Sequence, residues 1–416
     1  MSSLLLLMGL LLVAYLGSFL VGGERSLRGV GLPSSVEWVV VGFLIGPSAL
    51  GVVSRSLALA VGPVIIVALS WLLLVCGVQY PMTERGRVSR GRIAIGILWG
   101  SASAGAIGAA VYFALPFVAP ALMKDRVVLA LALAAASGET TQHVIRWVRE
   151  RYAAHGPLVD WLEDLAVAED LVPIGLIVAL SAIAGRSRAA TWIGPWAIAG
   201  VTVALGGLLG LLCALLLGRE FRVRESWGTL LGISLVGAGV AAQVGLSFLA
   251  VLFVLGATVT ATSHHSGEIR AMLAPTERGA LLPVLIVCGI SIDPHALKET
   301  AMLFGLVFGA RLVVRLVLGR LLAATLPYAE TAGAIRVGMG LLSSGSLTMC
   351  IGLAVELAFP GKTGDTVLTI AAALCIAGEL MGPPSLRGAL RRAGEIRAPE
   401  PPTPPPQPVT TEESQA

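Results

Sequence analysis

Two pairs of adjacent carboxylates interrupt a long apolar stretch in the first half of the chain. The pairs are Glu163-Asp164 and Glu169-Asp170. Two neighbouring carboxylates in a medium of low dielectric constant cannot both ionise cheaply, so such a pair is suited to exchanging a proton for a cation. The second pair continues directly into the apolar run 174–184. We therefore expect it to lie deeper in the apolar segment than the first pair, which we place near the water-accessible end.

Two arginines in a second apolar segment are candidate partners for these carboxylates. Arg311 lies near the middle of residues 299–326, and Arg315 lies one helical turn further on. A guanidinium group is permanently charged, so we expect Arg311 to compensate the charge of the acidic pair. We expect Arg315 to extend along the helix to the aqueous interface, as long cationic side chains do near helix ends. The simpler alternative is an acidic pair that an arginine merely neutralises, with no role in ion binding.

Polar, glycine-containing gaps divide two widely separated apolar segments. They are residues 137–142 and 340–346. Such a pair of gaps is typical of discontinuous helices in inverted repeats, where half-helix ends and free carbonyl groups line an ion site. Clusters of serine and threonine also hold neighbouring helices together, which is the alternative interpretation. The polar candidates in these gaps and in the last apolar segment are Glu139, Thr140, Thr141, Ser344, Ser346 and Glu379.

The composition indicates which elements must position these residues. Of the 416 residues 56% are hydrophobic and only 13% are charged, and the mean hydropathy is +0.86. A soluble domain carries about 25% charged residues, and one membrane crossing needs about 20 apolar residues. The sequence therefore predicts an all-α polytopic membrane protein with thirteen transmembrane helices. The predicted spans are about 3–23, 36–53, 57–79, 93–119, 127–143, 158–184, 190–218, 226–244, 247–263, 279–296, 299–326, 331–357 and 364–386.

The distribution of basic residues predicts the orientation of these spans. With an odd number of crossings, nineteen of the 29 lysines and arginines fall on the side of the C-terminus and seven on the other side. Basic residues favour the cytoplasmic side, so we expect the N-terminus outside and the C-terminus inside. The proline-rich tail 397–416 cannot build a hydrophobic core, and we expect it to be disordered.

Several classes of function lack support in the residues. The net charge of +4 does not indicate nucleic-acid binding, because lysine and arginine mainly set topology in membrane proteins. The five cysteines lie in apolar stretches without metal-ligand spacing, so we expect no metal and no cofactor. An intramembrane hydrolase would need a Gly-x-Ser nucleophile with a membrane histidine, or a Gly-x-Gly-Asp pair. Neither combination is present, so we expect no enzyme.

Several segments resemble the monovalent cation:proton antiporter superfamily, in particular its bacterial sodium/hydrogen exchanger and Kef-type branch. The early segment GFLIGPSALG is the most specific of them. The last resembles the final helix and tail of the family. In order along the chain, the segments are residues 42–51, 138–150, 169–170, 282–293 and 378–395.

This resemblance implies two inverted repeats with discontinuous crossing helices, all within one transmembrane domain over residues 1–396. It also implies a moving core and a scaffold that forms a homodimer in the lipid bilayer, here the cytoplasmic (inner) membrane of a bacterium. The core would comprise about 93–184 and 299–386, the scaffold about 3–79 and 226–296, and a linker helix 190–218.

The resemblance also implies a mechanism, in which Na⁺ or K⁺ is exchanged for protons by alternating access. Glu169 and Asp170 fall on the acidic dipeptide that binds ion and proton, and Arg311 falls on the basic residue of the crossing region. In the unwound helix Thr140 falls on the family's threonine, and Thr141 falls where an aspartate or serine is common. Two departures are notable. A glutamate replaces the first aspartate of the dipeptide, and residues 344–346 replace a charged Arg-Gly-Glu motif. The alternatives on the same scaffold are a cation efflux channel and an ion-coupled solute symporter.

Overall fold

The computed structural model describes residues 35–54, 60–83, 86–183, 194–218, 223–292, 297–325, 338 and 340–396. The predicted first span 3–23, the tail 397–416 and Arg336, which was expected within a span, lie outside these described residues. The helices of the first half are α2 (Glu37–Ile45), α4 (Gly62–Gln79), α5 (Arg90–Val118), α6 (Arg126–Gly138), α7 (Gln142–Arg151), α8 (Pro157–Glu169) and α9 (Leu171–Ile183). Those of the second half are α10 (Pro195–Leu217), α11 (Val223–Val244), α12 (Phe248–Thr262), α13 (Ser266–Leu273), α14 (Thr276–Ser291), α15 (Leu297–Thr325), α17 (Ser346–Ala358) and α18 (Lys362–Arg392). The short helix η1 (Pro120–Asp125) and the antiparallel strands β1 (Met82–Thr83) and β2 (Gly86–Arg87) complete the described elements.

Seven helical segments of the described residues are long and apolar enough to cross a membrane. There are eight if α13 and α14, which meet at an angle of 42°, form one span. The prediction of discontinuous helices is confirmed, because α6 ends at Gly138 within the first polar gap and α17 begins at Ser346, the last residue of the second. The predicted span 36–53 is helical only over nine residues. Its helix ends at Gly46, whose extended backbone is the conformation favoured before a proline.

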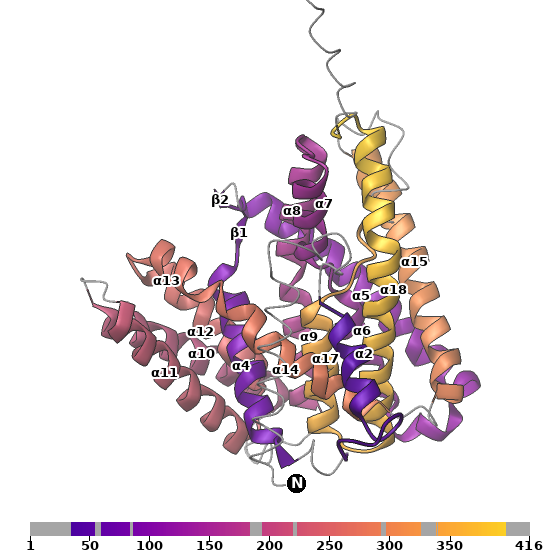
Figure 1. Ribbon diagram of the computed structural model, residues 1–416, viewed down its shortest axis with the longest axis horizontal. Helices are drawn as coiled ribbons and strands as arrows, with labels where there is room; N and C mark the ends of the chain where they lie inside the picture. Colours follow the sequence, from indigo (N-terminus) through magenta and orange to yellow (C-terminus); the bar gives the residue numbers. More distant parts are fainter. Residues whose placement is uncertain are drawn as a thin grey trace, which may run out of the picture.

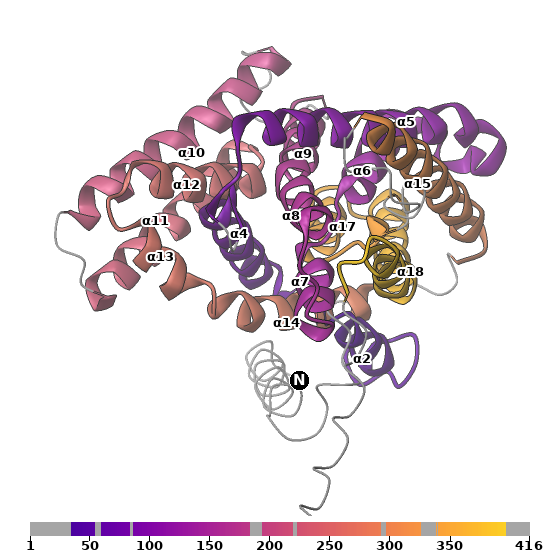
Figure 2. The same cartoon turned by 90° about the horizontal axis from the view of Figure 1, so that it is seen from above.

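The helices pack in two groups that meet near the middle of the molecule (Figure 1). In one group α12 packs against α4 and α10, α11 packs against α10, and α14 packs against α2 and α4. In the other, α5 packs against α6, α8 and α15, while α17 packs against α18 and α6. Figure 2 shows the same separation from above. We refer to α2, α4 and α10–α14 as the scaffold group, and to α5–α9, α15, α17 and α18 as the core group.

Glycines bring the scaffold helices into direct backbone contact. A Cβ atom at Gly77 of α4 would lie 2.1 Å from the carbonyl oxygen of Phe253 on α12. A Cβ atom at Gly42 of α2 would lie 2.1 Å from the carbonyl oxygen of Ile286 on α14. Small residues allow membrane helices to approach this closely. The glycine-rich segment 42–51 thus begins with a packing residue of the scaffold group.

Candidate cation site

The two helix breaks cross each other inside the core group. The backbone N–H of Thr141 donates to the carbonyl oxygen of Ser343 at 3.2 Å. The hydroxyl of Thr140 donates to the carbonyl oxygen of Leu341 at 3.0 Å. Both breaks leave backbone groups without their usual helical partners, and these bonds satisfy part of that requirement in a buried environment. The polar gaps identified in the sequence therefore form a single site, which we call the crossing (residues 139–141 and 341–345).

Gly345 makes this crossing sterically feasible. A Cβ atom at this position would lie 2.4 Å from the Thr141 hydroxyl oxygen. We expect Gly345→Ala to push the two breaks apart and to lower the free energy of unfolding by about 1–3 kcal/mol, measured by thermal unfolding in detergent. Gly309→Ala on α15 is the matched control, because a Cβ there meets nothing within 4 Å. Equal melting temperatures for G345A and the wild type would contradict the expectation.

The side chain of Arg311 on α15 contacts the crossing and is fully buried. Its guanidinium group donates to the carbonyl oxygens of Ser137, of Glu139 at 2.5 Å and of Ser343 at 3.3 Å. These carbonyl groups carry the negative ends of peptide dipoles at the broken helices. The positive charge of Arg311 is thus hydrogen-bonded to the backbone of both breaks.

Arg315 differs from its prediction. It is fully buried rather than extended to the aqueous interface. Its two terminal nitrogens lie 2.8 and 3.3 Å from the two carboxylate oxygens of Glu169, which is also fully buried. One of them also donates to the carbonyl oxygen of Gly138 at 2.9 Å. The expectation was wrong because Arg315 lies ten residues, or about 15 Å along the axis, before α15 ends at Thr325.

Asp170 occupies an irregularity between α8 and α9. Pro173 has no N–H to donate to the carbonyl group of Glu169, and its ring would clash with that group. The helix is accordingly interrupted for one residue at Asp170, whose backbone keeps helical angles, and α8 and α9 together form one span, Pro157–Ile183. Glu169 turns to Arg315, whereas Asp170 lines a cavity of about 40 Å³. The two carboxylates of the dipeptide therefore have different surroundings.

The cavity beside Asp170 is predominantly polar in its lining side chains. The Gln142 side-chain amide donates a hydrogen bond to an Asp170 carboxylate oxygen at 3.4 Å. A cavity of this size holds a monovalent cation with a few water molecules. The lining residues are Cys76, Gln79, Tyr80, Glu139, Thr140, Thr141, Gln142, His143, Arg146, Val167, Asp170, Glu277, Ser346 and Leu347.

Glu139 lies at the N-terminus of α17. One of its carboxylate oxygens accepts hydrogen bonds from the Thr348 N–H at 2.6 Å, the Thr348 hydroxyl at 2.7 Å and the Gly345 N–H at 3.4 Å. A helix N-terminus favours negative charge, so the start of α17 would stabilise this carboxyl group when it is ionised. The crossing thus holds the Arg311 guanidinium group against the backbone of both breaks and fixes the Glu139 carboxyl group at the start of α17.

Three further predicted residues lie in or beside the crossing. Ser346 lines the cavity, whereas Ser344 is part of the second break and is fully buried. Gly378 of α18 packs directly on that break, since a Cβ there would lie 2.7 Å from the Ser344 nitrogen. Glu379 is buried on α18 next to this contact. Ser344 and Glu379 therefore belong to the support of the crossing rather than to the cavity wall.

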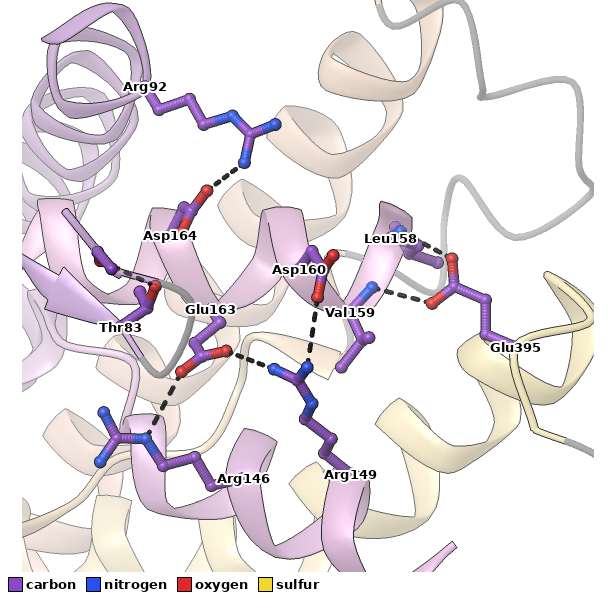
Figure 3. Close-up of polar contacts among 11 residues, drawn as sticks. Thr83, Arg92, Arg146, Arg149, Leu158, Val159, Asp160, Glu163, Asp164 and Glu395 are labelled. Atoms are coloured by element: carbon purple, nitrogen blue, oxygen red, sulfur yellow. Dashed lines mark hydrogen bonds and ion pairs between the residues drawn. The ribbon is translucent and has the colours of Figure 1, made fainter. Parts of the chain in front are cut away.

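The first acidic pair belongs to a network of ion pairs along α8 (Figure 3). The Glu163 side chain is fully buried, so the prediction that water reaches it was wrong, whereas Asp164 is 6% exposed and lines an open surface cavity with Arg92. Glu163 lies 2.9 Å from Arg149 and 3.5 Å from Arg146, and Asp164 pairs with Arg92. Helix α7 continues to Arg151, whereas the predicted span ends at residue 143. Arg146 and Arg149 therefore lie on a helix, where they form a basic face against α8, and not in a loop.

The N-terminus of α8 is capped by Glu395, a residue far along the sequence that follows α18. The Glu395 carboxylate accepts the backbone N–H groups of Leu158 at 2.6 Å and of Val159 at 2.9 Å, as drawn in Figure 3. Gly156 precedes the helix and supplies no side-chain cap. A Cβ at Gly156 would overlap the Glu395 side chain, at 2.3 Å from its carboxyl carbon. The residues that hold α8 thus come from α7, α5 and the segment after α18.

A sequence model described as "Sodium/hydrogen exchanger, transmembrane" matches residues 11–384. The chain belongs to the sodium/hydrogen exchanger family. The exchanger is also similar to a solved structure of the sodium proton antiporter MjNhaP1 from Methanocaldococcus jannaschii at pH 8, with a TM-score of 0.66 and 14% identity over 94% of this chain and 98% of that one. An electron-microscopy structure of MjNhaP1 gives a TM-score of 0.58 and 15% identity over 95% and 97% of the two chains. No curated protein matches the sequence.

The predicted family and fold class are therefore confirmed for this exchanger. The family match spans nearly the whole chain, and the solved structures share its fold at low sequence identity. The exchanger is an all-α, multi-pass membrane protein with discontinuous helices.

Proposed function

We propose that this exchanger moves a monovalent cation, Na⁺ or K⁺, against protons, with Asp170 binding each of them in turn. Exchange of a cation for protons accords with membership of the family. The observation that carries the assignment to Asp170 is the division of the dipeptide. Asp170 lines the cavity at the crossing, whereas the Glu169 carboxylate is engaged on both oxygens by Arg315. We assign Glu169 to positioning α8 against α15.

The proposed ligands of the cation are oxygen atoms around Asp170. Thr140, Thr141 and Ser346 line the same cavity and offer hydroxyl or backbone oxygens. Oxygen ligands suit alkali cations. A proton that binds Asp170 removes the charge that holds the cation, so the two compete for one carboxylate. Arg311 and Glu139 would hold the crossing in shape while this exchange takes place.

We propose that the core group carries Asp170 past a stationary scaffold group, so that the site faces one side of the membrane at a time. The bias of basic residues supports an outside N-terminus and an inside C-terminus. In that orientation the cavity is on the cytoplasmic side, because Gln79 and His143 adjoin the basic segments predicted inside. We also propose a homodimer through the scaffold group in the cytoplasmic membrane, as the family resemblance implies. No covalent reaction is required, so the protein is not proposed as an enzyme.

The proposal is tested in liposomes that contain the purified protein and a trapped pH-sensitive dye. A pH gradient is imposed, and Li⁺, Na⁺, K⁺ or Rb⁺ is then added outside. We expect a saturable collapse of the gradient by at least one of these cations, with cation uptake matched to proton release. Cation flux without proton movement would identify a channel, and a requirement for an added organic solute would identify a symporter. Either result would overturn the proposal.

The arrangement of the carboxylates predicts a one-for-one, electroneutral exchange. Glu139 is engaged by N–H and hydroxyl donors and Glu169 by Arg315, which leaves Asp170 as the exchanging carboxylate. A cycle that moved one net charge would gain about 2.3 kcal/mol from a potential of about 100 mV, or roughly 50-fold in the final cation gradient. We expect the final Na⁺ gradient to change less than twofold when such a potential is imposed. A large response to the potential would contradict one-for-one exchange.

A further inference from the structure

The cavity beside Asp170 has one wall from each helix group. Asp170 and Gln142 come from the core group, whereas Tyr80, which follows α4, and Glu277 of α14 come from the scaffold group. The Gln79 side-chain amide at the end of α4 donates to one Glu277 carboxylate oxygen at 3.2 Å. Two scaffold helices therefore fix Glu277, the cavity's carboxylate on the scaffold side, in place.

Glu277 also spans the boundary between the groups. Its other carboxylate oxygen lies 3.1 Å from Nε2 of His143 on α7, a helix of the core group. The side chains of His143 and Glu277 are 36% and 15% exposed, so this contact lies where the cavity reaches the surface of the protein. A movement of the core group relative to the scaffold group would separate His143 from Glu277.

The surroundings of Glu277 favour a cation. A carboxylate in a cleft with walls of low dielectric constant attracts cations and raises their local concentration. The cationic Arg146 that lines the same cavity belongs to α7 of the core group. The hydroxyl oxygen of Tyr80 is buried in the described structure without a hydrogen-bond partner, and Tyr80 lines the same cavity. A cation beside Glu277 would give that hydroxyl oxygen a partner. The scaffold wall thus offers both a charge and an oxygen ligand.

The opposite end of the boundary between the groups has a different character. An apolar cavity of about 290 Å³ lies there between α4, α9, α12 and α17, with Ile66, Leu180, Phe248 and Phe359 among its lining residues. Ile66 is thirteen residues before Gln79, which is about 20 Å along the axis of α4. None of the described residues that line this cavity is charged. The carboxylate Glu277 of the scaffold group therefore lies at one end of the boundary. The described residues that line the cavity at the other end include no such carboxylate.

We propose that Glu277 binds the monovalent cation at one face of the membrane only. At that face an entering cation binds Glu277 before it reaches Asp170, and a departing cation binds Glu277 after it leaves Asp170. This inference rests on the proposed function, in which Asp170 moves with the core group while Glu277 stays with the scaffold group. Glu277 is within reach of the site when the site faces the cavity side. It is out of reach when the site faces the apolar end. Glu277 therefore contributes to cation affinity on one side.

The test is the KM for the cation at each face, measured in membrane vesicles of opposite orientation. Glu277→Gln keeps the shape of the side chain and an oxygen for Gln79, but removes the charge. We expect the KM at the cavity face to rise roughly tenfold, with Vmax and the KM at the other face within twofold of wild type. Glu277→Asp, which keeps the charge, should restore most of the affinity. A purely structural role would move both faces together.

Glu268→Gln is the matched control. Glu268 on α13 also lies beside a histidine, His265, at 3.7 Å, but it is 56% exposed and does not line the cavity. It should leave both KM values unchanged. If E277Q does not reach the membrane, Gln79→Leu tests the same one-sided rise by removing the amide that fixes Glu277. Equal KM changes at both faces, or no change at the cavity face, would overturn this inference alone. Failure of the wild type to exchange ions would instead overturn the proposed function.

Discussion

Replacement of Asp170 by asparagine is expected to reduce cation-driven proton exchange to the rate of protein-free liposomes. The amide is close in size to the carboxylate, but it can neither bind a proton near neutral pH nor carry the charge that holds a cation. The Gln142 amide would still find an oxygen as its acceptor at this position. Proton flux and cation uptake in the same liposomes measure the loss, and thermal unfolding shows whether the variant is folded.

Asp160→Asn provides the control for this substitution. Asp160 lies on the same helix, α8, and its side chain is 27% exposed beside Arg149 at 3.7 Å. The pair is longer than a hydrogen bond, Arg149 keeps its contact with Glu163, and Asp160 does not line the cavity beside Asp170, so D160N should exchange ions at nearly the wild-type rate. Near-normal exchange by a folded D170N protein would remove Asp170 from the mechanism. The family membership and the fold would be unaffected by that result.

Arg315→Gln is expected to have the largest effect on stability. The substitution leaves the Glu169 carboxylate fully buried without its counter-charge, and breaking a buried ion pair in this way costs about 3–5 kcal/mol. We expect a large fall in the melting temperature in detergent and a low yield of folded protein. Arg320→Gln is the control, because Arg320 is on the same helix but exposed; exposed substitutions change stability by about 0.5 kcal/mol or less.

Replacement of both partners separates loss of the pair from loss of one charge. When a buried ion pair is exchanged for apolar side chains of similar volume, stability often recovers. We therefore expect R315L/E169L to unfold at a higher temperature than R315Q. An R315Q protein as stable as the wild type would show that Glu169 either pairs with another cationic group or is protonated. The exchange rate of the double variant then reports whether Glu169 positions Asp170.

The crossing could be predicted because its signal is local. Polar gaps in two widely separated apolar segments stand out in the sequence, and they are typical of discontinuous helices whose free backbone groups line a polar site. The division of labour between Glu169 and Asp170 is not local. It depends on the direction in which each side chain leaves the helix, and on Pro173, which removes one helical hydrogen bond at Glu169. Sequence spacing gives the faces of one helix, but not which neighbour each face meets.

The arginine partners of the first acidic pair and the position of Glu277 were missed for a related reason. The arginines of α7 look like topology-setting loop residues until the helix is seen to continue and face α8. Arg311 and Arg315 are four residues apart, so they share one face, and that face is buried against the crossing. Glu277 follows the start of α14, where acidic residues are common because they interact favourably with the helix dipole. Its role depends on Gln79 and His143, which are distant in the sequence.

The cap that Glu395 places on α8 has a practical consequence for handling the protein. The carboxylate that closes the N-terminus of α8 comes from a residue 237 positions later than Leu158, beyond the end of the last membrane helix at Arg392. A shortened version that stops at the end of that helix would retain every hydrophobic span and still lose the cap. Purification tags and fused reporters therefore belong after Ile396, so that the chain through Glu395 stays intact.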